Sequence, residues 1–225
     1  MDIAVLGTGS VGRTLAARLS ELGHHVTMGT RDPEATMARG ADERRRVEPF
    51  AAWQERHSDV ALSPYRDAAA SAQMVVNATA GEVSLTVLAE VGAGDLAGKV
   101  LVDVANPLDF SAGFPPTLSV KDDDSLGEQI QRAFPDARVV KTLNTMNASV
   151  MADPGALRAT TTVFVSGNDP DAKATVTELL MSLGHHDVLD LGDISTARGT
   201  EMYLPLWLRL MGVLGTATFN IKVVR

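Results

Sequence analysis

Six residues near the start of the chain have the types and spacing of a phosphate-binding turn. The run Gly7-Thr8-Gly9-Ser10-Val11-Gly12 fits the pattern G-x-G-x-x-G, directly after the apolar run 3–6 and directly before a helical pattern. The first glycine permits the bend, the second lets the backbone approach a pyrophosphate, and the third allows close helix–strand packing. The helix N-terminus offers free N–H groups and a positive dipole end. A glycine-rich turn without a ligand is the alternative, but the order strand, motif, helix and second strand favours a dinucleotide.

The residues after the second apolar run bear on which dinucleotide binds. The run 26–29 leads into Thr30 and Arg31, whose hydroxyl and guanidinium suit a phosphate on the ribose 2′ position. NAD instead favours an acidic side chain at this place, and Asp32 is the competing candidate. However, Asp32-Pro33 also has the pattern of a helix N-cap followed by proline at the first helical position. We therefore expect NADP rather than NAD.

Small and amide-bearing residues follow three further apolar runs. Thr79-Ala80-Gly81, Asn106-Pro107 and Asn144-Thr145 come at the ends of the runs 74–78, 100–104 and 138–143. Ligands of open α/β sheets bind outside the carboxyl edge, so these residues should meet there. The small residues would let the backbone approach the cofactor, and the two asparagines could hydrogen-bond the nicotinamide ribose or carboxamide. Asparagine and proline also simply terminate strands, and for each asparagine alone the two interpretations are equally good.

Other catalytic and metal-binding patterns are missing from the sequence. There is no cysteine, which excludes thiolate metal sites and a cysteine nucleophile, and no G-x-S-x-G, H-E-x-x-H or P-loop motif. The histidine pairs 24–25 and 185–186 precede strands, so we expect solvated turns there rather than a metal site. Asp103 lies inside a strand and is expected to be a hydrogen-bonded buried carboxylate rather than a catalytic base. We predict no catalytic side chain and no metal ligand.

The elements that must position these residues alternate between strands and helices. The apolar runs are largely continuous, as is typical of a parallel sheet covered on both faces. Strands are expected at 3–6, 26–28, 74–78, 100–104, 138–143, 161–165 and 186–191, and helices at 11–22, 125–134, 171–183 and 200–214. This alternation predicts a doubly wound α/β fold, a Rossmann-type parallel sheet with a smaller C-terminal portion of helical and αβ character. We expect an NADP-binding domain over 1–145 and the smaller portion over 146–225. The stretches 39–58 and 108–124 are not assigned a role.

Composition narrows the classes of partner. Lys and Arg total 20 against 28 Asp and Glu, a formal net charge of -8, and the run Arg44-Arg45-Arg46 is too short to make a basic face for nucleic acid. The apolar stretch 203–224 is interrupted by a proline and two basic residues, and its uninterrupted part 210–219 predicts a buried helix rather than a membrane span. With no secretory signal visible and no cysteine, we expect a cytoplasmic location without membrane insertion.

Taken together, these residues resemble the coenzyme F420-dependent NADP oxidoreductase family, whose fold also occurs in the cytosolic domain of the STEAP metalloreductases. The resemblance rests on segments spread over almost the entire length: the glycine motif 7–12, Gly29-Thr30-Arg31, Val140-Lys141-Thr142-Leu143-Asn144-Thr145, Glu201-Met202-Tyr203-Leu204-Pro205-Leu206-Trp207 and Asn220-Ile221-Lys222. The glycine motif is generic, whereas the later segments are more specific.

The resemblance implies a two-cofactor site. It places NADPH on the glycine motif and an F420 deazaflavin against the nicotinamide, in a cleft covered by 146–225. Hydride would pass directly between the two rings, which needs no general acid or nucleophile from the protein. By resemblance, Thr30 and Arg31 take the 2′-phosphate, and Asn144 with Thr145 line the nicotinamide end. Arg198 and Arg209 are the candidate cations for the acidic tail of F420.

The residues are compatible with several hydride acceptors. The second group could be a flavin or a small carbonyl or imine substrate, and the enzyme an NADPH-dependent flavin or ferric-chelate reductase. A non-catalytic NADPH-binding redox sensor is the alternative outside the enzymes. The C-terminal helix supplies Met202, Leu206, Leu210 and Met211, which could line a ring-binding pocket, a core or a homodimer face. Because this helix is apolar on nearly every side, we expect a homodimer.

Overall fold

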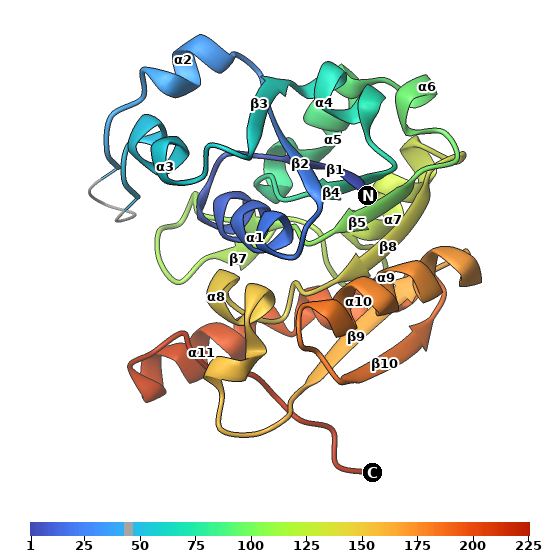
Figure 1. Cartoon of the computed structure of the whole chain (residues 1–225). Helices are drawn as coiled ribbons and strands as arrows, with labels where there is room; N and C mark the ends of the chain where they lie inside the picture. Colours follow the sequence, from blue (N-terminus) through green and yellow to red (C-terminus); the bar gives the residue numbers. More distant parts are fainter. Residues whose placement is uncertain (43–46) are drawn as a thin grey trace.

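A single mostly parallel sheet organises the molecule. The structure, a computed structural model, describes residues 1–42 and 47–225 (Figure 1). Arg44-Arg45-Arg46, considered above as a basic patch, lies outside these residues. The described strands form an eight-stranded sheet in the order β10-β9-β8-β5-β4-β1-β2-β3, in which β8 and β9 are antiparallel and all other neighbours are parallel. The predicted doubly wound α/β fold is therefore confirmed.

The strands of this sheet and a small separate hairpin have the following bounds. The sheet consists of β1 (Asp2–Leu6), β2 (His25–Thr30), β3 (Ala61–Pro64), β4 (Met74–Asn77), β5 (Val100–Asp103), β8 (Arg138–Thr142), β9 (Thr162–Gly167) and β10 (Asp187–Gly192). The hairpin pairs β6 (Leu108–Asp109) with β7 (Thr117–Leu118) in the segment 108–124. Because β1 pairs with β2 on one side and β4 on the other, the carboxyl end of β1 lies at the topological switch point, where ligands of this fold class bind.

Helices cover both faces of the sheet. They are α1 (Ser10–Glu21), α2 (Pro33–Met37), α3 (Phe50–Arg56), α4 (Tyr65–Ser71), α5 (Gly81–Val91), α6 (Ala93–Leu96), α7 (Leu126–Ala133), α8 (Ala148–Ala152), α9 (Pro170–Ser182), α10 (Ala197–Met202) and α11 (Leu204–Leu214), with short 3-10 turns at Pro154–Ala156 and Ile194–Thr196. The predicted capping box is present at α7, where the Ser125 hydroxyl accepts the Glu128 N–H at 3.1 Å and donates to the Glu128 carboxylate at 2.8 Å.

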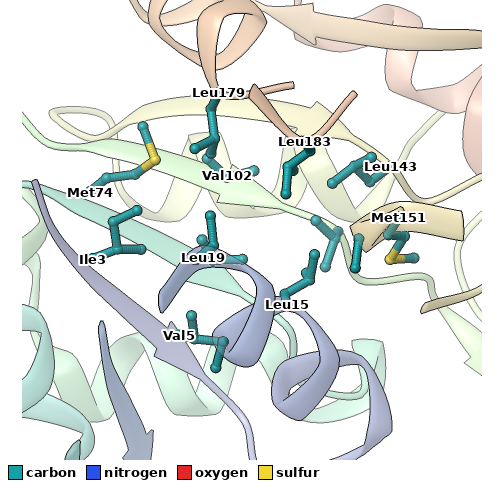
Figure 2. Close-up of a cluster of buried hydrophobic side chains, with 14 of the residues drawn as sticks. Ile3, Val5, Leu15, Leu19, Met74, Val102, Leu143, Met151, Leu179 and Leu183 are labelled. Carbon is teal, nitrogen blue, oxygen red and sulfur yellow. The ribbon is translucent and has the colours of Figure 1, made fainter. Parts of the chain in front are cut away.

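The core consists of two apolar layers that share the strands. Ile3 and Val5 of β1 pack in one buried cluster with Leu15 and Leu19 of α1 (Figure 2). The intervening Ala4 belongs to a second buried cluster, which includes residues of α4, α5 and α7. Successive residues of a strand point to opposite faces, so burial of both faces requires the continuous apolar runs seen in the sequence.

The C-terminal part of the chain extends the same sheet. β9 pairs antiparallel with β8, and β10 continues in parallel from β9, so no break in the sheet separates 1–145 from 146–225. That division stays a prediction. The buried helix predicted at 210–219 is wrong: α11 ends at Leu214, and Val213 is 85% exposed. Among the described helices, none is both long and apolar enough to cross a bilayer.

Candidate active site

The glycine motif forms the tight turn between β1 and α1. Gly7 has a φ of +111°, and a Cβ on it would lie 2.6 Å from the Ala78 carbonyl oxygen. A Cβ on Gly12 would lie 2.0 Å from the Gly7 oxygen, so only glycine lets α1 start against this turn. Gly9 is the N-cap of α1, and a Cβ on it would meet nothing within 4 Å. The backbone therefore presents an open approach to the N–H groups of the first helical turn.

A buried arginine, Arg13, stabilises this turn, and it is not among the site residues predicted from the sequence. Arg13 donates from Nε to the Thr8 carbonyl at 2.9 Å and from Nη1 to the Glu48 carbonyl at 2.8 Å. Its guanidinium lies 5.0 Å from the centroid of the Phe50 ring. Burial, followed by the charge of Arg39, lowers the pKa of Arg13. The glycine turn is thus held in place by a side chain of the helix that follows it.

A hydroxyl and guanidinium cluster lies at the carboxyl end of β2. The buried Thr30 hydroxyl lies 2.7 Å from the Thr36 hydroxyl. Arg39 donates from Nη2 to the Thr36 and Thr8 hydroxyls, each at 3.0 Å, and so joins α2 to the glycine turn. Arg31 is exposed beside this cluster and pairs with Glu90 at 3.5 Å. Two guanidinium groups therefore border the position predicted for a 2′-phosphate.

Arg39 was missed because it opens the segment 39–58, which has no helical or strand periodicity. The available signal was a basic residue close in sequence to the end of the second strand, where a 2′-phosphate was expected. Asp32, the competing NAD determinant, accepts the Ala35 N–H at 3.0 Å as the N-cap of α2. The prediction of a helix cap at Asp32 is confirmed.

A cavity of about 380 Å³ opens at the carboxyl edge of the sheet. Seven of the predicted site residues line it: Ser10, Val11, Thr79, Ala80, Gly81, Asn106 and Asn144. Pro107 and Thr145 are buried next to these residues and do not line the cavity. Asn106 donates to the Asn144 carbonyl at 2.8 Å, and Asn144 donates back to the Asn106 side-chain oxygen at 3.0 Å. These two bonds join the loops that follow β5 and β8 at the lining of the cavity.

One wall of the cavity is apolar and comes from the later part of the chain. Met146, Met151, Leu204 and Trp207 line it, together with Phe110 from the 108–124 segment. The indole of Trp207 stacks on Phe219 with ring centroids 5.2 Å apart. The C-terminal helix thus contributes to the cavity through its first turn.

Of the three roles left open for the apolar residues at 202, 206, 210 and 211, the lining of the cavity is excluded. Met202 and Leu206 are 39% and 55% exposed, and neither they nor Leu210 and Met211 line the cavity. The helical pattern located the apolar residues but could not determine which side of the helix faces the sheet, because the helix is apolar on nearly every side.

Charge is scarce around the cavity. Among the described residues that line it, Glu82 is the only one with a charged side chain. Arg198, a predicted cation for an acidic tail, donates from Nε and Nη2 to the Glu128 carboxylate at 2.8 and 2.6 Å, so its guanidinium is already paired. The hydrogen bonds from Arg198 lower the pKa of Glu128 despite its partial burial. Arg209 is exposed on α11 and is not part of the lining.

Beneath the cavity floor lies a buried polar ladder across three strands. Asn77, Asp103 and Lys141 occupy paired positions at the ends of β4, β5 and β8. Asn77 donates to Asp103 at 2.9 Å, and Lys141 Nζ lies 2.8 Å from Asp103 and 2.8 Å from Glu201 of α10. Burial alone would lower the pKa of Lys141, but the carboxylates of Asp103 and Glu201 more than offset it and raise that pKa. The prediction of a hydrogen-bonded buried Asp103 is confirmed. Lys141 and Glu201 belong to segments that carry the family resemblance, but the sequence analysis assigned neither of them a structural role.

The histidines lie away from the cavity, and one prediction about them is wrong. His185 is not in a solvated turn: it is 1% exposed, and its Nε2 lies 3.0 Å from the Met151 carbonyl. Burial lowers its pKa. Within 1–42 and 47–225, no group of three or more histidine, aspartate or glutamate side chains has an arrangement that could hold a metal ion.

The fold and the site together are those of the α/β dinucleotide-binding class. The family described as NADP oxidoreductase, coenzyme F420-dependent, matches residues 2–107. The structure superimposes with a TM-score of 0.96 on that of a proposed F420-dependent NADP reductase from Arthrobacter sp. FB24, at 61% identity and over 100% of both chains. The chain belongs to the coenzyme F420-dependent NADP oxidoreductase family.

More distant relatives agree with this assignment. The chain is 26% identical to the F420-dependent NADP reductase of Methanocaldococcus jannaschii over 212 residues, which is 93% of this chain and 92% of that protein. It is 27% identical to the metalloreductase STEAP3 of Rattus norvegicus over 209 residues, but these are only 37% of that longer protein. The comparison with STEAP3 therefore concerns one part of a larger molecule.

Proposed function

We propose that this protein transfers hydride between NADP(H) and the deazaflavin F420. The observation that carries this proposal is the position of the cavity: it lies between the N-terminus of α1 and an apolar wall, and its lining offers amides and small residues with a single carboxylate. Such a lining suits the positioning of two rings more than acid–base or nucleophilic chemistry. The family membership supports the same assignment.

The dinucleotide would lie along the carboxyl edge of the sheet. The open backbone at Gly9 and the N–H groups of Ser10 and Val11 suit the pyrophosphate, because a helix N-terminus attracts anions. The adenosine end would reach the cluster at β2, where Arg31 and Arg39 offer two guanidinium groups to a 2′-phosphate. Thr8 and Thr30 would add hydroxyl donors. Arg39 thus joins the residues proposed from the sequence.

The nicotinamide end would lie over the paired asparagines. Asn106 and Asn144 hold each other in place by two hydrogen bonds, which fixes the floor of the cavity before any ligand binds. Thr79, Ala80 and Gly81 leave room for the backbone to approach the ribose. A Cβ on Gly81 would lie 2.1 Å from the Asn106 oxygen, so glycine is needed for this close packing of two loops. When both cofactors are bound, the reaction itself is hydride transfer between their rings.

The second ring would rest on the apolar wall. Leu204, Trp207 and Met151 supply flat, water-excluding surface opposite the asparagines. The cavity fits the ring of F420 better than its acidic tail, since the described lining contains no lysine or arginine. The tail would therefore extend out of the cavity, where Arg209 lies exposed on α11.

Two further expectations stay proposals. The exposed apolar residues Leu206, Val213 and Leu214 of α11 support a homodimer face. A cytoplasmic location is proposed because the cofactors are intracellular metabolites and the sequence has no cysteine. Size-exclusion chromatography coupled to light scattering tests the homodimer, with Val213→Glu as the variant that should weaken it.

A spectrophotometric screen tests the activity. NADPH oxidation is followed with F420, FMN, FAD and ferric chelates as acceptors, and the proposal expects F420 to give the highest kcat/KM. Preferred reduction of a ferric chelate or flavin would instead support the reductase suggested by the similarity to STEAP3. Tight NADPH binding without turnover of any acceptor would support a redox sensor.

A further inference from the structure

Lys141 is a fully buried cation whose hydrogen-bonding capacity is completely used. Its side chain is 0% exposed, and its ammonium contacts three acceptors: the Asp103 carboxylate, the Ala105 carbonyl and the Glu201 carboxylate. An ammonium group has three protons, so no donor is left over. The three acceptors come from the end of β5, the loop that follows it and α10. Lys141 therefore ties the sheet edge to the C-terminal helices.

Glu201 carries this connection from Lys141 to a second helix. Its carboxylate accepts the N–H groups of Leu126 and Gly127 at 2.8 and 3.1 Å, which are free donors of the first turn of α7. Like Lys141, Glu201 is sealed from solvent, with 1% exposure. An ion pair that is buried and fully hydrogen-bonded is weak evidence for stability, but it fixes the relative placement of the elements that it joins.

Both ends of this connection meet the cavity. Ala105, whose carbonyl accepts from Lys141, lies in the cavity lining next to Asn106. On the other side, α10 ends at Met202 and α11 begins at Leu204, and the Tyr203 N–H bonds to Gly199 so that the helical path continues between them. The position of Glu201 therefore sets the position of Leu204 and Trp207 on the apolar wall.

We propose that Lys141 is a positioning residue for the second substrate, acting through Glu201. The pair holds the apolar wall at the distance from the asparagine floor that a stacked ring requires, and does not contact either cofactor. This inference rests on the proposed function for the identity of the substrate, whereas the placement of the wall can be measured without any substrate.

Glu128 provides a matched control for Glu201. Both are carboxylates that connect α7 with α10, but Glu128 pairs with Arg198 and is not in contact with Lys141. Glu201→Gln and Glu128→Gln each remove one charge and keep the side-chain volume. If the role of Glu201 were general cohesion of the two helices, the two variants would behave alike.

The first measurement uses the fluorescence of Trp207 to report the position of the apolar wall. Trp53 lies in α3 against Phe50 and His57, so Trp53→Phe leaves Trp207 as the single tryptophan. In this background we expect Glu201→Gln to raise the acrylamide quenching constant of Trp207 at least about twofold and to shift its emission to longer wavelength, because the buried indole becomes hydrated. Glu128→Gln should leave both unchanged. Equal values for Glu201→Gln and its parent would overturn the proposal.

The second measurement separates the two substrates. With wild-type Trp53, Glu201→Gln and Lys141→Met should raise the KM for F420 at least about tenfold and leave the Kd for NADPH, from calorimetry, within about twofold. If Lys141→Met does not fold, the KM for F420 and the Kd for NADPH of Glu201→Gln test the proposal. A rise in the NADPH Kd by the same factor would show a general structural role and overturn the inference. No F420 turnover by the wild type would refute the proposed function, while the Trp207 comparison would still test the positioning of the wall.

Discussion

The glycine turn and the apolar wall face the same cavity but are built in opposite ways. The turn consists of consecutive residues, and its critical contacts are backbone atoms, such as the Gly7 oxygen against Gly12. The wall includes Leu204 and Trp207, and we propose that a buried ion pair between Lys141 and Glu201, residues far apart in the chain, places them. One half of the site is specified locally and the other by long-range contacts.

Variation in function can arise in the wall without change in the turn. A backbone turn accepts a pyrophosphate whatever the second substrate is, since its contacts use N–H groups common to all residues. The wall depends on particular side chains, so its shape can change without loss of the dinucleotide site. The similarity of the chain to both F420-dependent NADP reductases and STEAP metalloreductases fits this division.

The largest expected effect comes from a single methyl group in the glycine turn. Gly12→Ala places a Cβ against the Gly7 oxygen, so α1 must shift, and we expect the free energy of unfolding to fall by about 3 kcal/mol with loss of NADPH binding. Gly9→Ala is the matched control, because a Cβ there meets nothing within 4 Å. Urea denaturation measures both variants.

Gly9→Ala should behave differently from Gly12→Ala. Its unfolding free energy should stay within about 0.5 kcal/mol of the wild type. Its Kd for NADPH should rise at least about tenfold, because the added methyl group blocks the approach of the pyrophosphate. Unaltered NADPH binding by Gly9→Ala would show that the phosphates do not cross this turn.

The arginines at the end of β2 should discriminate between the two dinucleotides. Arg31→Ala and Arg39→Ala each remove a cation from the proposed 2′-phosphate site, and we expect the Kd for NADPH to rise about tenfold to a hundredfold while that for NADH changes less than about twofold. Arg66→Ala, which breaks a surface pair with Asp95, is the charge-matched control. An equal loss for NADPH and NADH would exclude a role in reading the 2′-phosphate.

The success of sequence reasoning follows the same division between local and long-range contacts. Seven strands of the described sheet, the glycine turn, the Asp32 cap and the Ser125 capping box depend mainly on neighbours in sequence, and the sequence predicts them. β3 (Ala61–Pro64) and the hairpin of β6 and β7 were not predicted. His185, Lys141 and the side of α11 that faces the cavity depend on segments that meet only in the folded chain. A buried lysine inside an apolar run signals a buried partner, but the sequence does not say that the partner is Glu201.

The smallest expected effect is the acid response of a surface pair beside α7. Hydrogen bonds from Arg132 lower the pKa of Asp124 to about 2, from 3.8. Because the folded state binds this proton less readily, the pair stabilises the fold above pH 3.8, and this contribution is lost as the pH falls toward 2. Solvent screening limits it to under about 1 kcal/mol.

Urea unfolding of the wild type and of Arg132→Gln at two pH values checks this acid response. At pH 5, above both the ordinary pKa of 3.8 and the lowered pKa of about 2, the Asp124 carboxyl is ionised; pH 2.5 lies between these two pKa values. The difference in stability between the two proteins should be largest at the higher pH and shrink at the lower one. A difference that grows as the pH falls would show that Asp124 is not held as a carboxylate by Arg132. The Trp207 signal should not respond to Arg132→Gln, which separates this surface pair from the buried pair that places the wall.

Isotope transfer shows directly whether hydride passes from NADPH to F420 on this protein. NADPH carrying deuterium at one or the other position of nicotinamide C4 is oxidised by the protein with F420 as acceptor, and the reduced deazaflavin is analysed by mass spectrometry. If the two rings are held face to face, hydride leaves from one face of the nicotinamide only. Deuterium should then appear in the reduced deazaflavin with one of the two labelled forms of NADPH and be absent with the other. Reduced deazaflavin without deuterium from either form, or no reduction of F420 at all, would contradict the account.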